Sequence, residues 1–191
     1  EDGDGETSTT TVQYGTGFKH GSLFMSASHF DQQEIAARDR NVSRDADGRL
    51  RGGADLRSSA TPSARVTLPD GDTVILDDQS GQYRPVEAND LFNYPDFTSS
   101  LVPSERDFFY GSASYDFSEK IAITLEASYT DTSSEAKLAP TPIFTAFEQN
   151  PIPVAADNIY NPFGVEVIDL RRRMLELPAR RQQNKSDVSR F

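Results

Sequence analysis

The 191-residue sequence contains no cysteine and no tryptophan, and only 36% of its residues are hydrophobic. The absence of cysteine excludes a disulfide scaffold and zinc sites with thiolate ligands. The hydrophobic fraction lies below the roughly 45–50% of ordinary soluble domains, a reference that also counts glycine. We therefore expect much of the chain to be solvated loop, although its length would allow a sizeable core.

A basic surface is also missing, because the formal net charge is −11. Binding to nucleic-acid phosphates requires a basic stripe, so we expect no nucleic-acid partner. The sequence has no run of the ~20 apolar residues that a membrane-spanning helix needs. Membrane-spanning strands stay open as a possibility, because their signal is only an alternation over about ten residues.

Alternation of apolar and polar residues is clearest in residues 108–117 and 121–130, whose odd positions carry the aliphatic and most of the aromatic side chains. The turn between the two segments is short, so together they predict a hairpin. Residues 9–18 and 22–31 form a similar, less regular unit around another short turn. Each strand has about the length that a tilted strand needs to cross a bilayer.

The hairpins are joined and followed by long polar connections, at about residues 32–107 and 131–184. Compact soluble domains rarely contain structureless loops beyond about 15 residues. Short turns on one side and long loops on the other are typical of transmembrane barrels. We predict an all-β fold in which residues 1–191 supply antiparallel strands of a transmembrane β-barrel with long extracellular loops, as a partial barrel. The alternative is a soluble sandwich of half-exposed strands.

Two smaller elements are expected inside the long connections. Residues 64–78 read as a hairpin around a turn at 69–72, which contains proline, aspartate and glycine. A helix is expected near residues 167–177, because three apolar side chains share one face there and Pro178 would end it.

Chemical motifs are weak throughout the sequence. The acidic stretches EDGDGE at residues 1–6 and DADG at 45–48 resemble calcium loops but lack the later carboxylates, so they read as solvated turns. His20 and His29 have no partner at metal-ligand spacing, and no serine stands in a nucleophile elbow. We expect no enzyme activity, no metal site and no cofactor.

The segment from Asp157 to Arg173 combines an aromatic turn with three consecutive arginines. Proline at 162 fixes its own φ and glycine at 164 permits the chain to reverse direction. The turn therefore holds its two aromatic side chains in a fixed position. The arginines offer planar forks of donors to a ligand or to carboxylates of the same chain. The candidate ligand-binding residues are Tyr160, Asn161, Phe163, Arg171, Arg172 and Arg173. The alternative is that the arginines tie the loops together and that Phe163 anchors the turn.

A family resemblance rests on several of these stretches. LAPTPIF at residues 138–144, followed by DNIYNPFGVEVIDLRRRMLELPARR at 157–181, resembles the extracellular loop and next-strand entry of TonB-dependent outer-membrane receptors. Residues 92–130 look like the strand pair before this loop, with Glu105 and Arg106 matching its serine-glutamate-arginine strand entry. Residues 21–40 are similar to an earlier strand of the family.

The resemblance implies a plugged barrel of ~22 strands in the bacterial outer membrane. Such a receptor imports a siderophore, cobalamin or a saccharide with energy relayed by TonB through the plug, and it contacts outer-membrane lipid. No plug or TonB box is visible here, the chain starts at Glu1 instead of a methionine, and a fifth strand only begins near Lys185. We therefore expect the chain to be an interior fragment of the β-barrel of such a receptor, with its extracellular loops. The alternative function is a secreted or surface-exposed β-rich binding or adhesion module.

Overall fold

The computed structural model describes residues 4–147 and 149–191. These residues form an all-β structure with antiparallel sheets and no α-helix, so none of their helical segments is long and apolar enough to span a membrane. The chain divides into two compact units. The strand unit comprises the described residues up to Ala36 with residues 99–137 and 181–191, and the loop unit comprises residues 37–98 and 138–180.

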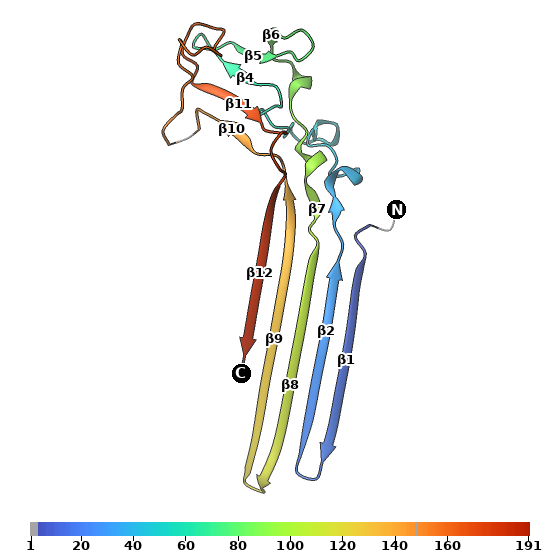
Figure 1. Cartoon of the computed structure of the whole chain (residues 1–191). Helices are drawn as coiled ribbons and strands as arrows, with labels where there is room; N and C mark the ends of the chain where they lie inside the picture. The colour runs from blue at the N-terminus through green and yellow to red at the C-terminus, as the bar shows by residue number, and fades with distance from the viewer. Residues whose placement is uncertain (1–3, 148) are drawn as a thin grey trace. The chain divides into compact units, whose positions relative to one another are not determined.

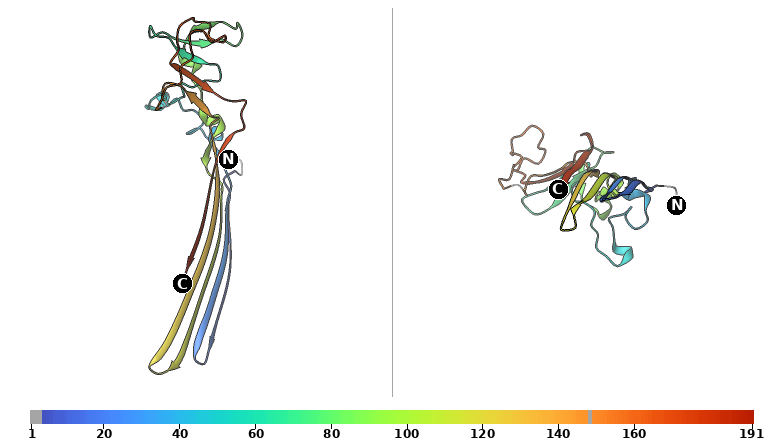
Figure 2. Two further views of the ribbon diagram at one scale, coloured as in Figure 1. Left: turned by 60° about the vertical axis from the view of Figure 1, so that its left-hand side comes forward. Right: turned by 90° about the horizontal axis from the view of Figure 1, so that it is seen from below.

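The strand unit is built on a five-stranded antiparallel sheet that forms a single layer (Figures 1 and 2). Its strand order is β1-β2-β8-β9-β12, so β1 and β12 are the edges and the sheet is open. A small pair, β3 (Ile35–Ala36) and β7 (Ser99–Leu101), belongs to the same unit. The five long strands are β1 (Thr7–Phe18), β2 (Gly21–Gln32), β8 (Ser104–Ser118), β9 (Ile121–Leu138) and β12 (Arg180–Arg190).

Short and long connections leave opposite ends of this sheet. Two-residue turns at 19–20 and 119–120 join β1 to β2 and β8 to β9. At the other strand ends the chain runs into the long connections that build the loop unit. The two predicted hairpins are confirmed, but the strands are longer than expected, and the fifth strand begins at Arg180, ahead of the predicted start near Lys185.

The loop unit contains a second five-stranded sheet, of order β10-β11-β4-β5-β6. Leu170 of β11 pairs with Val66 of β4, so strands from both long connections share this sheet. Its small core contains Ala60, Val66, Ile75 and Val167. The strands are β4 (Arg65–Thr67), β5 (Thr73–Leu76), β6 (Tyr83–Pro85), β10 (Pro142–Phe144) and β11 (Asp169–Arg173). Four single-turn 3-10 helices complete it: η1 (Ala37–Asp39), η2 (Arg49–Arg51), η3 (Ala88–Asp90) and η4 (Tyr94–Phe97).

Predictions for the loop unit have mixed outcomes. The hairpin predicted within residues 64–78 is confirmed as β4 and β5, with Arg65 opposite Ile75. The helix predicted near residues 167–177 is wrong, because β11 occupies the segment and pairs on both sides, with β10 and β4. The expectation that the connections are mostly loop is wrong to the extent that they form this sheet.

Candidate functional site

The strand register assigns the side chains of the long sheet to two different faces. Directly opposed residues of antiparallel strands point to the same side, and neighbours along a strand point to opposite sides. Tyr14, Met25, Gly111 and Ala127 therefore lie in one row across β1, β2, β8 and β9. We name the side that carries this row the apolar face and the other side the hydroxyl face.

Across β1, β2, β8 and β9 the apolar face consists of four successive rows without a charged residue; on the neighbouring β12, Asp187 accepts a hydrogen bond from the Tyr129 hydroxyl at 3.1 Å. The row nearest the short turns contains Phe18, Tyr115 and Ile123, and the fourth row contains Val12, Ala27, Phe109 and Tyr129. In full, the four rows comprise Phe18, Gly21, Tyr115, Ile123; Thr16, Leu23, Ala113, Leu125; Tyr14, Met25, Gly111, Ala127; and Val12, Ala27, Phe109, Tyr129.

Aromatic rings mark both ends of the apolar face. Tyr115 and Phe117 are in edge contact near the turns, with ring centroids 4.8 Å apart. Phe109 and Tyr129 stack in the fourth row, with centroids 6.4 Å apart. The rows between carry small or aliphatic side chains on β8 and β9. The third and fourth rows border an open groove of about 540 Å³. Paired aromatic belts around an aliphatic band are the surface pattern of transmembrane barrels.

The height of the apolar face also matches a bilayer. From Ile121 at the turn to Tyr129 the strand advances eight residues, or ~27 Å along its axis. A tilt of ~35–45° reduces this length to a height of about 20 Å, close to the ~25 Å apolar band of such barrels. The next row is charged, because His29 lies opposite Asp107 and their side chains are 2.8 Å apart. The apolar band therefore ends where the charged row begins.

The side chains of the apolar face lie open to the surroundings. Leu125 is 68% exposed, Ile121 57% and Ile123 46%. No second sheet of the described residues packs on them. Contiguous exposed apolar side chains of this kind are typical of surfaces that contact another protein or a membrane.

All three predicted ligand-binding arginines are engaged inside the loop unit, and Arg171 and Arg172 pair with carboxylates there. Arg171 forms an ion pair with Asp169, in which Nη2 lies 2.7 Å from Oδ2. Its guanidinium also donates a hydrogen bond to Ser59 and lies over the ring of Phe147. The hydrogen bonds from Arg171 lower the pKa of Asp169, whose burial acts in the opposite direction. Arg172 forms a 2.8 Å ion pair with Glu176. Both pairings support the alternative in which arginines tie the loops together.

Arg173 is the most enclosed of the three arginines, with 6% of its surface exposed. Its Nη1 donates to the carbonyl oxygen of Pro140 and its Nη2 to Oγ of Ser58, both at 2.7 Å. Its guanidinium lies 5.2 Å from the centre of the Phe92 ring. Burial lowers the pKa of Arg173, and the charge of Arg180 adds to this effect. Arg173 thus links the two long connections.

The aromatic turn divides its side chains between structure and solvent. Asn161 Nδ2 donates to the carbonyl oxygens of Ala155 and Val165, so this amide holds the turn closed. Phe163 is half-buried against Tyr83, with ring centroids 4.7 Å apart, and anchors the turn as the alternative interpretation expects. Tyr160 is 85% exposed and is the candidate that remains available to a ligand. Ligand binding by these residues stays a prediction.

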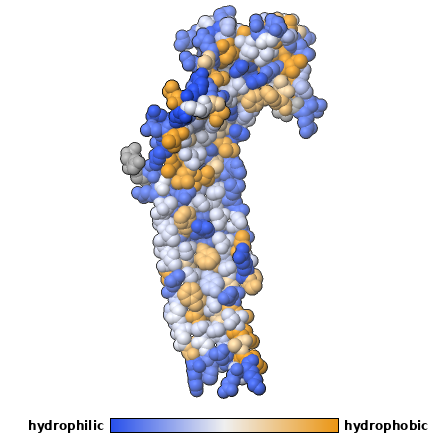
Figure 3. Space-filling view, turned by 180° about the vertical axis from the view of Figure 1, so that it is seen from behind, coloured by the Kyte–Doolittle hydropathy of each residue, from blue (hydrophilic) through white to orange (hydrophobic). Residues whose placement is uncertain are grey.

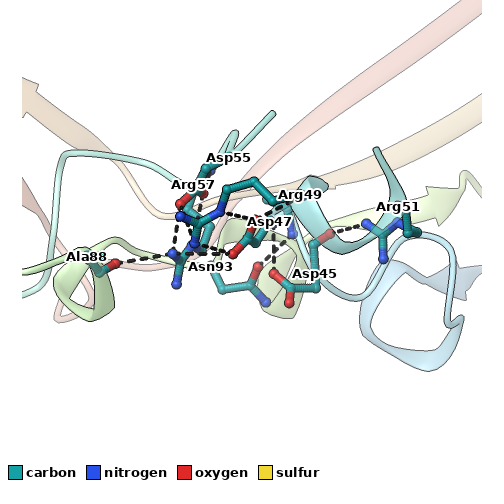
Figure 4. A network of polar contacts seen from close by, with 9 residues as sticks. Asp45, Asp47, Arg49, Arg51, Asp55, Arg57, Ala88 and Asn93 are labelled. Carbon is teal, nitrogen blue, oxygen red and sulfur yellow. Dashed lines mark hydrogen bonds and ion pairs between the residues drawn. The ribbon is translucent and has the colours of Figure 1, made fainter. Parts of the chain in front are cut away.

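The DADG stretch belongs to an arginine–carboxylate network (Figure 4). Arg49 lies 2.6 Å from Asp47 and Arg57 lies 2.8 Å from Asp55. Hydrogen bonds from Arg49 and Arg57, respectively, lower the pKa of Asp47 and of Asp55. The described residues contain no group of three or more potential metal ligands. The first three residues of EDGDGE lie outside the described residues.

Sequence reasoning missed the pairing of His29 with Asp107, because the two residues are far apart in the chain and only the register of β2 against β8 joins them. It also missed the contacts between the two long connections. Comparisons of the chain with protein-family models, curated proteins and solved structures found no match.

Proposed function

We propose that the chain is part of a TonB-dependent outer-membrane receptor that binds and imports a scarce nutrient such as a siderophore, cobalamin or a saccharide. In this role β1, β2, β8, β9 and β12 cross the bacterial outer membrane as part of a barrel. The long connections lie on the extracellular side and the two-residue turns on the periplasmic side.

The observation that carries this proposal is the exposed apolar face with its two aromatic belts. In a soluble β-sandwich, a second sheet would cover such a face. Leu125, Ile121 and Ile123 have no such cover among the described residues. Acyl chains are the surroundings in which these exposed side chains cost no free energy. The exposure therefore favours the receptor over a secreted binding or adhesion module.

The open edges of the sheet set a condition on the proposal. An unpaired backbone group in lipid costs several kcal/mol, so only closed barrels cross a bilayer with strands. The edge strands β1 and β12 must then pair with further strands of the same barrel. The proposed receptor is accordingly an assembly of more strands than these five.

Ligand capture is assigned to the loop unit. Tyr160 stands exposed on a turn that Asn161 closes with two hydrogen bonds, so it offers a stacking surface at a fixed position. A fixed aromatic side chain loses little conformational entropy on binding. Arg171 and Arg172 retain partly exposed guanidinium groups beside their carboxylate partners.

Cysteine labelling tests which side of the membrane each connection lies on. The 191-residue sequence contains no cysteine, so a substituted cysteine is the only one in this part of the protein. We expect Tyr160→Cys, in the complete gene product, to react on intact cells with a maleimide too large to cross the outer membrane. Lys120→Cys, in the turn between β8 and β9, should react only after the outer membrane is opened. The unsubstituted protein provides the blank. Equal labelling of both positions on intact cells would contradict the proposed topology.

A further inference from the structure

One face of the sheet in the loop unit carries three arginines in a single row. Arg171 of β11 lies opposite Arg65 of β4. Ile75 of β5 lies opposite Arg65 on one side and opposite Arg84 of β6 on the other. Directly opposed residues of antiparallel strands point to the same side, so these four side chains share one face. We name Arg171, Arg65 and Arg84 the arginine row.

The two outer members of the arginine row are paired with carboxylates. Arg171 forms its ion pair with Asp169. The two terminal nitrogens of Arg84 lie 2.8 and 2.6 Å from the two carboxylate oxygens of Asp90. Bidentate pairs of this kind are among the strongest arginine–carboxylate contacts. Each outer arginine therefore has a counter-charge within the loop unit.

Arg65, in the middle of the row, has no such partner. No hydrogen bond or ion pair joins its guanidinium to any group within residues 4–147 and 149–191, and its Nε is shielded from solvent without an acceptor. Its two terminal nitrogens are not shielded in this way, so they are the atoms that a further partner can reach. The residue directly opposite, Arg171, carries the same charge, and like charges at opposed positions of a sheet repel each other.

The arginine row lies beneath other segments of the loop unit. Ile75, the neighbour of Arg65 in the row, is 4% exposed. Arg171 donates a hydrogen bond to Ser59, and Asp90, at the other side of the row, lies on η3. Figure 3 shows many hydrophilic side chains, in blue, on the visible surface of the loop unit, where charged groups meet water. Arg65 is instead half-buried, a position that a small ion reaches more readily than another polypeptide segment does.

The electrostatic surroundings of Arg65 favour an anion. Burial lowers the pKa of Arg65 and the charge of Arg171 adds to this effect, whereas Asp169 and Asp90 act in the opposite direction. Arginine stays protonated in proteins, so deprotonation does not relieve the cost of the unpaired charge. Where a shielded polar group of a native protein lacks a partner, a bound ion or water is one of the physical explanations. An anion would supply the missing counter-charge.

We propose that Arg65 binds a small inorganic oxyanion, phosphate or sulfate, while Arg171 adds positive charge from the opposite strand. The planar fork of the guanidinium matches two oxygens of such an anion, which a halide ion does not offer. Because β4 and β11 come from different long connections, the bound anion stabilises the pairing of the two connections. The inference goes beyond the proposed function and does not depend on the membrane topology.

Hydrogen exchange of the β4 and β11 amides tests this proposal. The complete gene product is compared in about 20 mM sodium phosphate, in about 20 mM sodium sulfate, and in sodium chloride at the same ionic strength. For a Kd of about 1 mM, at least one oxyanion should slow exchange of these amides about 20-fold relative to chloride. Chloride measures the effect of ionic screening alone.

Arg65→Met removes the charge and keeps the apolar stem of the side chain. This variant should lose the response to phosphate and sulfate. In chloride its amides should exchange no faster than those of the unsubstituted protein, since its repulsion with Arg171 is gone. Arg172→Met is the matched control, because Arg172 neighbours Arg171 in β11 and points to the other face. It should keep the oxyanion response within about twofold.

A second substitution keeps the test decisive if Arg65→Met does not fold. Arg65→Lys retains the positive charge without the fork of donors, so it should reduce the oxyanion response on the order of tenfold. The inference is overturned if neither phosphate nor sulfate slows exchange more than chloride does, or if the response survives substitution of Arg65. Cysteine labelling does not involve this site, so the receptor topology stands or fails separately.

Discussion

Replacing Arg173 by alanine is expected to lower the local free energy of unfolding of the loop unit by about 2–4 kcal/mol. The substitution removes hydrogen bonds from a charged donor to Pro140 and Ser58, each of which contributes about 1.5–3 kcal/mol. It also removes the contact with the Phe92 ring and leaves a cavity in a small core. The measurement is the hydrogen-exchange protection of the β4 and β11 amides, which reports local opening.

Arg172 supplies the matched control for this prediction. It neighbours Arg173 in the same strand, but its ion pair with Glu176 is solvent-exposed on both sides. Exposed pairs contribute roughly 0–1 kcal/mol, so Arg172→Ala should change protection little. Equal effects of the two substitutions would contradict the assignment of Arg173 as the link between the two long connections.

Replacing Leu125 by arginine is expected to destabilise the membrane-inserted protein by about 2–4 kcal/mol, because Leu125 lies in the middle of the apolar face. Arginine at the centre of a bilayer has lost its hydration and has no partner. Urea-driven unfolding of the complete gene product from liposomes, followed by circular dichroism, measures the change. A soluble binding module predicts the opposite, since substitution of a 68% exposed leucine would alter stability by less than about 0.5 kcal/mol.

Thr124→Arg is the control for Leu125→Arg, because the neighbouring side chain points to the hydroxyl face. In the proposed barrel that face points into the polar interior, away from lipid, so this substitution should cost less than about 1 kcal/mol. Similar losses for both variants would show that arginine disturbs the strand itself. Only a large difference between the two neighbours supports lipid on one side of β9.

The strands of the long sheet were predictable because their signal is local. An alternation with a period of two determines both the strand and its faces, and two short turns determine the hairpins. Once Ala27 is placed opposite Phe109, the register also requires His29 to face Asp107. The sequence alone does not place β2 against β8, since a long connection separates them, and this pairing was therefore missed.

The loop sheet was not predictable for the same physical reason. Its strands are three to five residues long, too short to show a period, and β11 resembled a helix because apolar residues at 170, 174 and 177 fit both patterns. The environment of Arg173 depends on Ser58 and Phe92, which are distant in sequence. The composition therefore indicated that arginines could pair internally, but only the fold shows which of them becomes buried.

The most direct test of the central claim uses nitroxide spin labels introduced by cysteine substitution at each position from 121 to 129 of β9. The complete gene product is placed in liposomes, and collisions are measured with oxygen, which concentrates in lipid, and with a water-soluble nickel complex. The account predicts alternation with a period of two, with odd positions accessible to oxygen and even positions accessible to nickel. Odd positions shielded from both reagents, or equally accessible to nickel, would contradict it.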